Sequence, residues 1–106
     1  MRWIVEAAPG VAEEIEDLAP GLQARMLRLF DLIETLGPDR LHEPHAKHLV
    51  GKLWELRVKS DEGIARGIYV TLAGRRVVVL HVFHKKSQKT PRRSLDLARS
   101  RMEAPE

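Results

Sequence analysis

Residues 53–83 limit the possible folds of this chain more than any other segment, because three apolar runs follow one another with only short turn signals between them. Asp61-Glu62-Gly63 separates the first run from the second, and Gly74 separates the second from the third. Apolar runs joined by tight turns are typical of antiparallel strands. The expected strands are residues 53–59, 64–72 and 76–83. A chain with this segment has to fold around a sheet.

The side-chain pattern within these strands predicts what each face contacts. The first strand alternates, so its apolar side chains share one face and its charged side chains share the other. The apolar face holds Trp54, Leu56 and Val58, and the charged face holds Glu55, Arg57 and Lys59. The third strand contains Val77-Val78-Val79-Leu80, and such a continuous apolar run favours burial on both faces.

Two helices are expected before this segment. Apolar side chains recur with helical spacing over residues 11–18 and over residues 21–36, and Gly37-Pro38 ends the second helix. Residues 2–6 are rich in strand formers and are followed by Pro9-Gly10, which predicts a short N-terminal strand. The two helices form a hairpin whose apolar stripe needs a sheet to cover it.

The segments on either side of the three strands differ in character. Residues 38–52 contain two prolines, a glycine and three histidines without any period, which predicts a loop. A C-terminal helix is expected with Thr90 as its N-cap and Pro91 in its first turn. Its buried stripe consists of Leu95, Ala98 and Met102. This order of elements predicts an α+β domain with the helices on one side of a mostly antiparallel sheet.

Composition narrows the class of protein. A chain of 106 residues makes one domain, residues 1–106. No run approaches the roughly 18–20 apolar residues of a membrane span, and Glu6 interrupts the N-terminal apolar residues too early for a signal peptide, so we expect a cytoplasmic protein without a membrane partner. The chain has no cysteine, which excludes disulfides, thiolate nucleophiles and cysteine-rich zinc sites.

The charge is unevenly divided along the chain. Residues 1–50 hold five Lys/Arg against nine Asp/Glu, whereas residues 51–106 hold thirteen against six. Clustered Lys and Arg bind phosphates through counterion release, so the division suggests a basic working face. A basic surface that serves only solubility is the alternative, and charge alone favours it.

His42, His45 and His48 recur every third residue and could in principle bind a metal. Pro44 interrupts the helix that would align the three rings, and no carboxylate pattern of a zinc motif accompanies them. A histidine-rich surface loop is the favoured interpretation, so we expect neither a metal nor a cofactor. The sequence motifs of serine hydrolases, zinc proteases and phosphate-binding glycine loops are also missing.

The last expected strand runs directly into a basic segment. Between Lys85 and Arg93, five of nine residues are Lys or Arg, and a helix is expected to begin nearby. Backbone N–H groups at a helix start and basic side chains bind phosphate, and an aromatic ring stacks on a base. The candidate RNA-binding residues are Phe83, His84, Lys89, Arg92 and Arg93. A strand end that is basic only by chance is the competing interpretation.

Three parts of the chain carry a family resemblance. They are Leu53-Trp54-Glu55-Leu56-Arg57, Arg66 with Tyr69, and residues 79–91 with the pattern Phe-x-Lys-Lys-x-Gln-Lys-Thr-Pro. These segments and the order of elements resemble toxins of the RelE/ParE superfamily, most closely its phage-derived, HigB-like branch. Ser87 departs from the threonine that is usual in this pattern, and His84 occupies a variable position.

The resemblance implies a bacterial type II toxin that enters the A site of the 70S ribosome and cuts mRNA. It also implies a cognate antitoxin, a small helix-turn-helix protein of the HigA type, which either covers the basic cleft or binds the helical hairpin. Cutting RNA by internal transfer needs a base for the 2′-OH, charge stabilisation of the phosphorane and a proton for the 5′-oxygen. The expected catalytic residues are Arg57, Arg66, Tyr69, Lys85 and Lys86.

The two arginines and the tyrosine each have a structural alternative. Arg57 and Arg66 are expected to hold the phosphate, since guanidinium matches its oxygens in a bidentate way, although Arg57 can instead form a salt bridge with Glu55. Arg66 shares its face of an ideal strand with apolar side chains, where a charge is costly unless that face lines a cleft. Tyr69 falls on the opposite face, so a joint role with Arg66 requires a bulge or twist, for which Gly67 is the candidate.

The sequence does not decide which residues serve as the catalytic acid and base. One of Lys85 and Lys86 can serve if neighbouring cations lower its pKa, and His84 is the alternative because imidazole titrates near neutrality. His81 shares the strand face of Phe83 and can line the same cleft, although a hydrogen-bonded core histidine is more common. Two other functions stay open: a ParE-like inhibitor of DNA gyrase, and a noncatalytic nucleic-acid-binding module.

Overall fold

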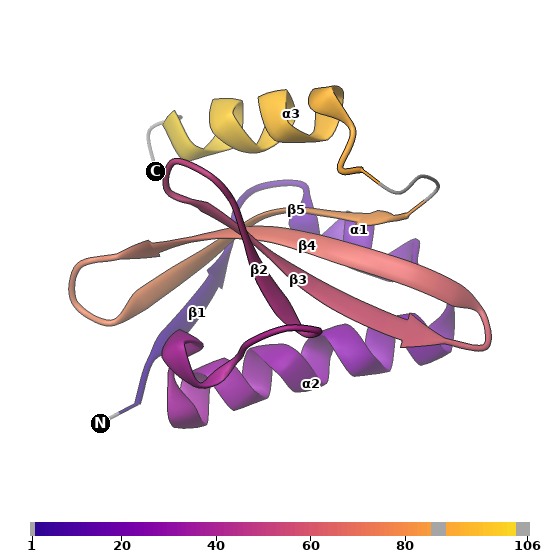
Figure 1. Ribbon diagram of the computed structural model, residues 1–106, viewed down its shortest axis with the longest axis horizontal. Helices are drawn as coiled ribbons and strands as arrows, with labels where there is room; N and C mark the ends of the chain where they lie inside the picture. Colours follow the sequence, from indigo (N-terminus) through magenta and orange to yellow (C-terminus); the bar gives the residue numbers. More distant parts are fainter. Residues whose placement is uncertain (1, 86–88, 104–106) are drawn as a thin grey trace.

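The structure is a computed structural model that describes residues 2–85 and 89–103. Its elements run in the order β1 (Ile4–Ala7), α1 (Val11–Glu16), α2 (Pro20–Leu36), the short 3-10 helix η1 (Pro38–Arg40), β2 (Ala46–Val50), β3 (Leu53–Ser60), β4 (Gly63–Leu72), β5 (Arg76–His84) and α3 (Arg92–Glu103). The α+β class and the order of the expected elements are confirmed (Figure 1). No helix in the described ranges is long and apolar enough to cross a membrane.

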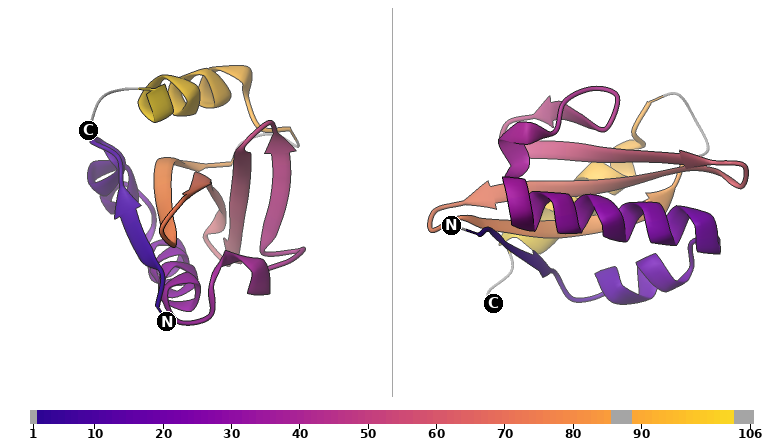
Figure 2. Two further views of the ribbon diagram at one scale, coloured as in Figure 1. Left: turned by 90° about the vertical axis from the view of Figure 1, so that its left-hand side faces the viewer. Right: turned by 90° about the horizontal axis from the view of Figure 1, so that it is seen from below.

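The five strands form one mixed sheet in the order β1-β5-β4-β3-β2. β1 runs parallel to β5, and the other neighbours are antiparallel. The expectation that all helices lie on one side is wrong, because α2 covers one face and α3 lies on the other (Figures 1 and 2). The central strand β4 is buried without interruption over residues 65–70, which includes both of its faces, so both sides of the sheet need a cover.

The expected loop over residues 38–52 is also wrong in part, because it contains η1 and the edge strand β2. β2 pairs with β3 through registers such as Ala46 with Leu56, and its register shifts between His48 and Val50. Ala46 is the one fully buried residue of β2, so the strand has no alternating apolar pattern. Backbone pairing with β3 stabilises β2, and sequence periodicity carries no signal for that pairing.

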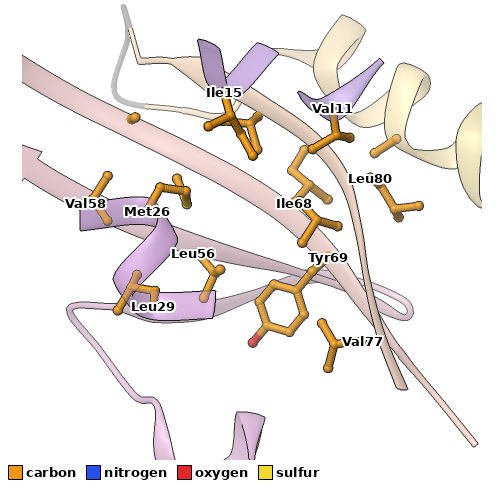
Figure 3. Packing of buried hydrophobic residues seen from close by; sticks show 14 of the residues in the cluster. Val11, Ile15, Met26, Leu29, Leu56, Val58, Ile68, Tyr69, Val77 and Leu80 are labelled. Carbon is orange, nitrogen blue, oxygen red and sulfur yellow. The ribbon is translucent and has the colours of Figure 1, made fainter. Parts of the chain in front are cut away.

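The main core lies between α2 and the sheet. Helix α2 contributes a buried stripe of Leu22, Met26, Leu29 and Ile33. Figure 3 shows Met26 and Leu29 close to Leu56 of β3, with Tyr69 of β4 pointing into the same cluster. The expected inward position of Trp54 is only partly met, because Trp54 is 39% exposed and its ring lies edge-on to that of His48.

Candidate functional site

Two arginines on neighbouring strands meet around one buried carboxylate. Arg57 of β3 lies directly opposite Arg66 of β4 in the sheet register. Glu55 precedes Arg57 by two residues on the same strand face and is fully buried. Arg57 Nε donates a hydrogen bond to Glu55 Oε1 at 3.0 Å, and Arg66 Nε lies 3.4 Å from the same oxygen. Glu55 therefore fixes both guanidinium groups and neutralises only one of their two charges.

Thr90 joins this group from the segment before α3. Its hydroxyl accepts a hydrogen bond from Arg66 Nη1 at 2.8 Å and donates one to Glu55 Oε2. The expected N-cap role of Thr90 is therefore not met, and the N–H groups of Ser94 and Leu95 bond instead to the carbonyl of Pro91. The hydroxyl oxygen accepts from the charged guanidinium of Arg66 in place of a helix N–H, and hydrogen bonds that involve a charged group are stronger than those between neutral groups.

Lys85 extends the positive charge beyond the two arginines. Its backbone N–H donates to the carbonyl of Ile64 at 2.8 Å, which holds the end of β5 against β4. Burial and then the charges of Arg66 and Arg57 lower the pKa of the Lys85 ammonium, while Glu55 acts in the opposite direction. A lysine with a lowered pKa has a larger neutral fraction at a given pH, and the neutral amine is the form that accepts a proton. Lys86, with Ser87 and Gln88, lies outside the described residues.

Arg66 is the most deeply placed cation of the group. It is 2% exposed, and burial, opposed by the charge of Glu55, lowers the pKa of its guanidinium. An arginine stays protonated even with a lowered pKa, so Arg66 presents a permanent charge in poorly hydrated surroundings. Charge–charge interactions are stronger there than in bulk water. We call Glu55, Arg57, Arg66, Lys85 and Thr90 the Glu55 cluster.

Two grooves open on either side of the Glu55 cluster, and Arg57 and Arg66 line both of them. The first, of about 570 Å³, lies between α2, the segment before β2 and the β3–β4 hairpin, and includes Lys85. We call it the α2 groove. The second, of about 260 Å³, lies between β2, β3 and the start of α3, and includes Lys47 and Lys89. We call it the β2 groove. Lys89, one of the residues expected to bind RNA, therefore lies next to the cluster.

Tyr69 is not brought to the arginines. It pairs with Trp54, is 2% exposed and points into the α2 core, on the sheet face opposite Arg66 (Figure 3). A bulge is present, but it is not at Gly67: Ile68 pairs with His81 and Tyr69 with Val79, so the extra residue belongs to β5. The alternation of β4 is therefore intact. Burial, and then the charge of Asp39, raise the pKa of the Tyr69 phenol to about 12.

Phe83 and His81 lie on the same strand face as Arg66 but contact each other. Phe83 is opposite Arg66 in the register, and its ring stacks on that of His81 with centroids 5.0 Å apart. His81 Nδ1 lies 3.0 Å from Glu14 Oε2 of α1. Both rings line a hollow between α1 and α3 that also includes Arg93. His81 is thus a hydrogen-bonded, mostly buried histidine, and Phe83 is partly exposed between this hollow and the Glu55 cluster.

The other expected RNA-binding residues lie at the periphery. The exposed ring of His84 lies over Gly63, where an added Cβ would approach Nε2 to 2.7 Å, and the pairing of His84 with Ala65 puts it on the face opposite Arg66. Arg92 and Arg93 are exposed on the first turn of α3. Their charges face solvent around the cluster, and neither residue lines the two grooves as the described residues define them.

The histidine-rich segment has structural roles. His48 Nε2 lies 2.8 Å from the Gly51 carbonyl, and the His45 carbonyl accepts a hydrogen bond from the Arg57 N–H at 2.9 Å. Residues 2–85 and 89–103 contain no group of three His, Cys, Asp or Glu that could hold a metal ion.

Sequence reasoning missed Glu55 and Thr90 as members of the site. The sequence alone offers Glu55 only as a salt-bridge partner of Arg57, on the charged face of its strand. The start of α3 covers that face, and α3 was expected on the other side of the sheet. The available signal is an acidic residue on the sheet face that carries both arginines. How deeply that residue is buried depends on long-range packing, which local sequence patterns do not report.

Comparison with known proteins identifies the family. Among solved structures the chain is similar to a double mutant of the Escherichia coli toxin RelE in the free state, with a TM-score of 0.69, 13% identity, and 96% of this chain and 99% of that chain covered. It is also similar to the RelE–RelB complex of Pyrococcus horikoshii, with a TM-score of 0.56, 20% identity and coverage of 79% and 96%. A third match is the toxin–antitoxin complex RelBE2 of Mycobacterium tuberculosis, with a TM-score of 0.52, 18% identity and coverage of 80% and 100%.

These identities are low, so the structural matches establish the RelE fold. No curated protein matches the sequence. The model of a protein family described as phage-derived protein Gp49-like matches residues 13–103. Because that match spans most of the sequence, the chain belongs to the phage-derived Gp49-like family.

Proposed function

We propose that this protein is the toxin of a type II toxin–antitoxin system, of the HigB-like branch of the RelE/ParE superfamily, and that it cuts mRNA in the A site of the 70S ribosome without a metal ion. The observation that carries the proposal is the Glu55 cluster, in which Arg57, Arg66 and Lys85 surround a single carboxylate. The family match and the RelE fold support it. The proposed site of action is the cytoplasm.

Arg57 and Arg66 bind the scissile phosphate in this proposal. Guanidinium groups pair with phosphate oxygens through two parallel hydrogen bonds, and Glu55 holds the two groups side by side before RNA arrives. Negative charge accumulates on the phosphorane as the 2′-oxygen attacks. The two guanidinium groups, joined by the Lys85 ammonium once it has taken the proton, stabilise that charge more than they stabilise the bound substrate, which lowers the barrier.

Lys85 is the proposed base. Its neutral amine takes the proton of the 2′-OH, the 2′-oxygen forms a bond to phosphorus, and the bond from phosphorus to the 5′-oxygen breaks. The products are a 2′,3′-cyclic phosphate and a 5′-OH, and the leaving oxygen takes its proton from a second group, for which Lys86 is the candidate. Lys89 and Phe83 contact the flanking RNA, and His84, Arg92 and Arg93 add charge or contacts at the periphery.

The proposed partner is a cognate antitoxin. Two of the similar structures are complexes of RelE-type and RelB-type proteins, which supports an inhibitory partner for this chain as well. The sequence resemblance favours a small helix-turn-helix protein of the HigA type. Co-expression of such a protein from the neighbouring gene is expected to restore the growth of cells that express this chain.

The direct test adds the purified protein to translating ribosomes and maps the 5′ ends of the mRNA fragments by primer extension. We expect cuts within A-site codons and fragments with a free 5′-OH, which polynucleotide kinase labels without prior phosphatase treatment. Intact mRNA would refute the proposal. Early DNA damage in cells, with translation still running, would instead indicate the gyrase-directed function of ParE-like relatives.

A further inference from the structure

The α2 groove has a charge pattern that the proposed chemistry does not explain. Six of its lining residues are Arg or Lys, and none of its described lining residues is Asp or Glu. Three of the six belong to the Glu55 cluster and surround the scissile phosphate. The other three, Arg25, Arg28 and Lys59, lie away from the proposed reaction, and Arg25 and Arg28 come from the acidic half of the chain.

The floor of the groove is apolar. Leu29 and Leu32 of α2 lie beside Val58, Ile64 and Pro44 among the lining residues. The segment before β2 is fixed against β3, because the His45 carbonyl accepts the Arg57 N–H. The groove is thus preformed, and its lining combines these apolar residues with His45 and the arginines. A base can lie on apolar or aromatic side chains while its phosphate contacts arginine.

We propose that the α2 groove is a subsite for a nucleotide that flanks the scissile phosphate of a single-stranded RNA, with Arg25 and Arg28 on its phosphate and the apolar floor under its base. This inference rests on the proposed endonuclease function and extends it. Continuity favours RNA over a protein ligand: Arg57, Arg66 and Lys85 line the same groove, so a strand with its scissile phosphate at the cluster passes into it. The β2 groove, with Lys47 and Lys89, takes the strand on the other side.

Arg25 and Arg28 suit substitution because both are exposed on α2, between the buried Leu22, Met26 and Leu29. Glutamine has nearly the helix propensity of arginine, so R25Q/R28Q preserves the helix. The matched control is R2Q/R40Q, which removes the same charge from two exposed arginines that line neither groove. Circular dichroism and thermal unfolding verify that both variants are folded.

The experiment measures binding of a fluorescent ten-nucleotide RNA of mixed sequence by anisotropy over a range of salt concentrations. Every nucleotide carries a 2′-O-methyl group, so that the RNA cannot be cut. For R25Q/R28Q we expect binding about tenfold weaker, and a slope of log K against log salt smaller by about 0.7 for each lost phosphate contact. For R2Q/R40Q we expect less than about a twofold change.

Two results would overturn the inference. Equal losses in both double variants would mean that only the overall charge matters. Equal competition by an oligo-glutamate peptide of the same charge would indicate a general anion or protein surface. Failure of the proposed function can be told from failure of the inference. If R25Q/R28Q loses RNA affinity but the wild-type protein cuts no mRNA, only the proposed function is refuted. If the wild-type protein cuts mRNA but R25Q/R28Q binds RNA with unchanged affinity, only the subsite is refuted.

Discussion

Within residues 2–85 and 89–103, two largely buried carboxylates bind arginine, and they differ in what surrounds them. In the Glu55 cluster, one carboxylate faces Arg57, Arg66 and the nearby Lys85. In the second group, which we call the Glu14 cluster, Glu14 of α1 accepts hydrogen bonds from Arg101 of α3 at 2.8 and 3.0 Å.

The Glu14 cluster is occupied by the protein itself. Glu14 Oε2 also lies 3.0 Å from His81 Nδ1, and Glu14 Oε1 accepts a hydrogen bond from the backbone N–H of Val82 at 3.0 Å. Arg101 also donates to the Leu80 carbonyl. Leu80 is the bulge residue of β5, beyond the end of its pairing with β1. This cluster therefore ties α1 and α3 to an open strand edge. One arginine balances one carboxylate, and the histidine completes the group.

The balance of charge distinguishes the structural ion pair at Glu14 from the proposed binding site at Glu55. A buried ion pair whose charges balance and whose hydrogen bonds are satisfied holds the fold together and has little charge left to attract a ligand. The Glu55 cluster keeps a surplus of cations between two grooves, which is costly in the free protein and is offset when an anion binds. The following substitutions test that difference.

Of the two carboxylates, Glu55 is expected to give the larger effect when it is changed to Gln. Loss of the carboxylate charge removes the common anchor of Arg57 and Arg66, so the guanidinium groups are no longer held in place for the phosphorane. We expect cutting about 100-fold slower, with a smaller change in RNA affinity because the positive charges remain. Single-turnover cutting and anisotropy measure the two quantities. Equal losses in rate and affinity would argue against a positioning role for Glu55.

The same substitution at Glu14 should act on stability instead. Glu14→Gln weakens the contacts to Arg101 and His81 and leaves a largely buried arginine poorly compensated. We expect a decrease of about 2 kcal/mol in the free energy of unfolding, measured in urea, with unchanged cutting per folded molecule. A loss of cutting in protein that is fully folded would contradict the assignment of Glu14 to the fold.

The pKa of Lys85 provides a smaller, graded test. Arg57→Gln removes a positive charge near the ammonium, which stabilises the protonated form and raises the pKa of Lys85. The neutral fraction at a given pH then falls, so the alkaline rise of the cutting rate moves to higher pH. NMR titration of the Lys85 side chain measures the pKa directly. Arg101→Gln is the control, and an equal shift there would rule out a local effect.

The smallest effect concerns Tyr69, the one tyrosine of the chain. Its pKa is about 12, against about 10 for an exposed phenol, so the folded state disfavours tyrosinate. The free energy of unfolding therefore falls as pH rises from about 10 to about 12. Absorbance of tyrosinate near 295 nm follows this single group. A midpoint near 10 in the folded protein would show that the phenol reaches solvent, and would return Tyr69 to the candidates for RNA contact.

Local sequence patterns predict the elements that have a strong period and miss those held by long-range pairing. Helix α2 and strands β3, β4 and β5 follow from apolar spacing and turn signals. Even the pairing of Arg57 with Arg66 is implied by the tight turn at residues 61–62, from which both are equally distant. Strand β2 carries no such pattern, because it is held in place by backbone pairing with β3 and not by an apolar face of its own.

The sequence names only part of the candidate cluster. The structure brings Arg57, Arg66 and Lys85 together and keeps Tyr69 and His84 apart from them. Thr90 and Glu55 are brought together by the packing of α3 on the sheet face opposite α2, and that position followed from no local signal. Two common residue types that lie far apart in the sequence can be recognised as parts of one site only when the packing of the helices on the sheet is known.

The most direct test of the central claim compares Arg66→Gln with Arg101→Gln in mRNA cutting on translating ribosomes, normalised to the folded fraction. Both substitutions remove a largely buried arginine from a carboxylate. If the Glu55 cluster is the catalytic centre, the cutting rate falls by about 1,000-fold in Arg66→Gln and changes by less than about threefold in Arg101→Gln. Cutting by folded Arg66→Gln at a rate near that of the wild type would contradict the account.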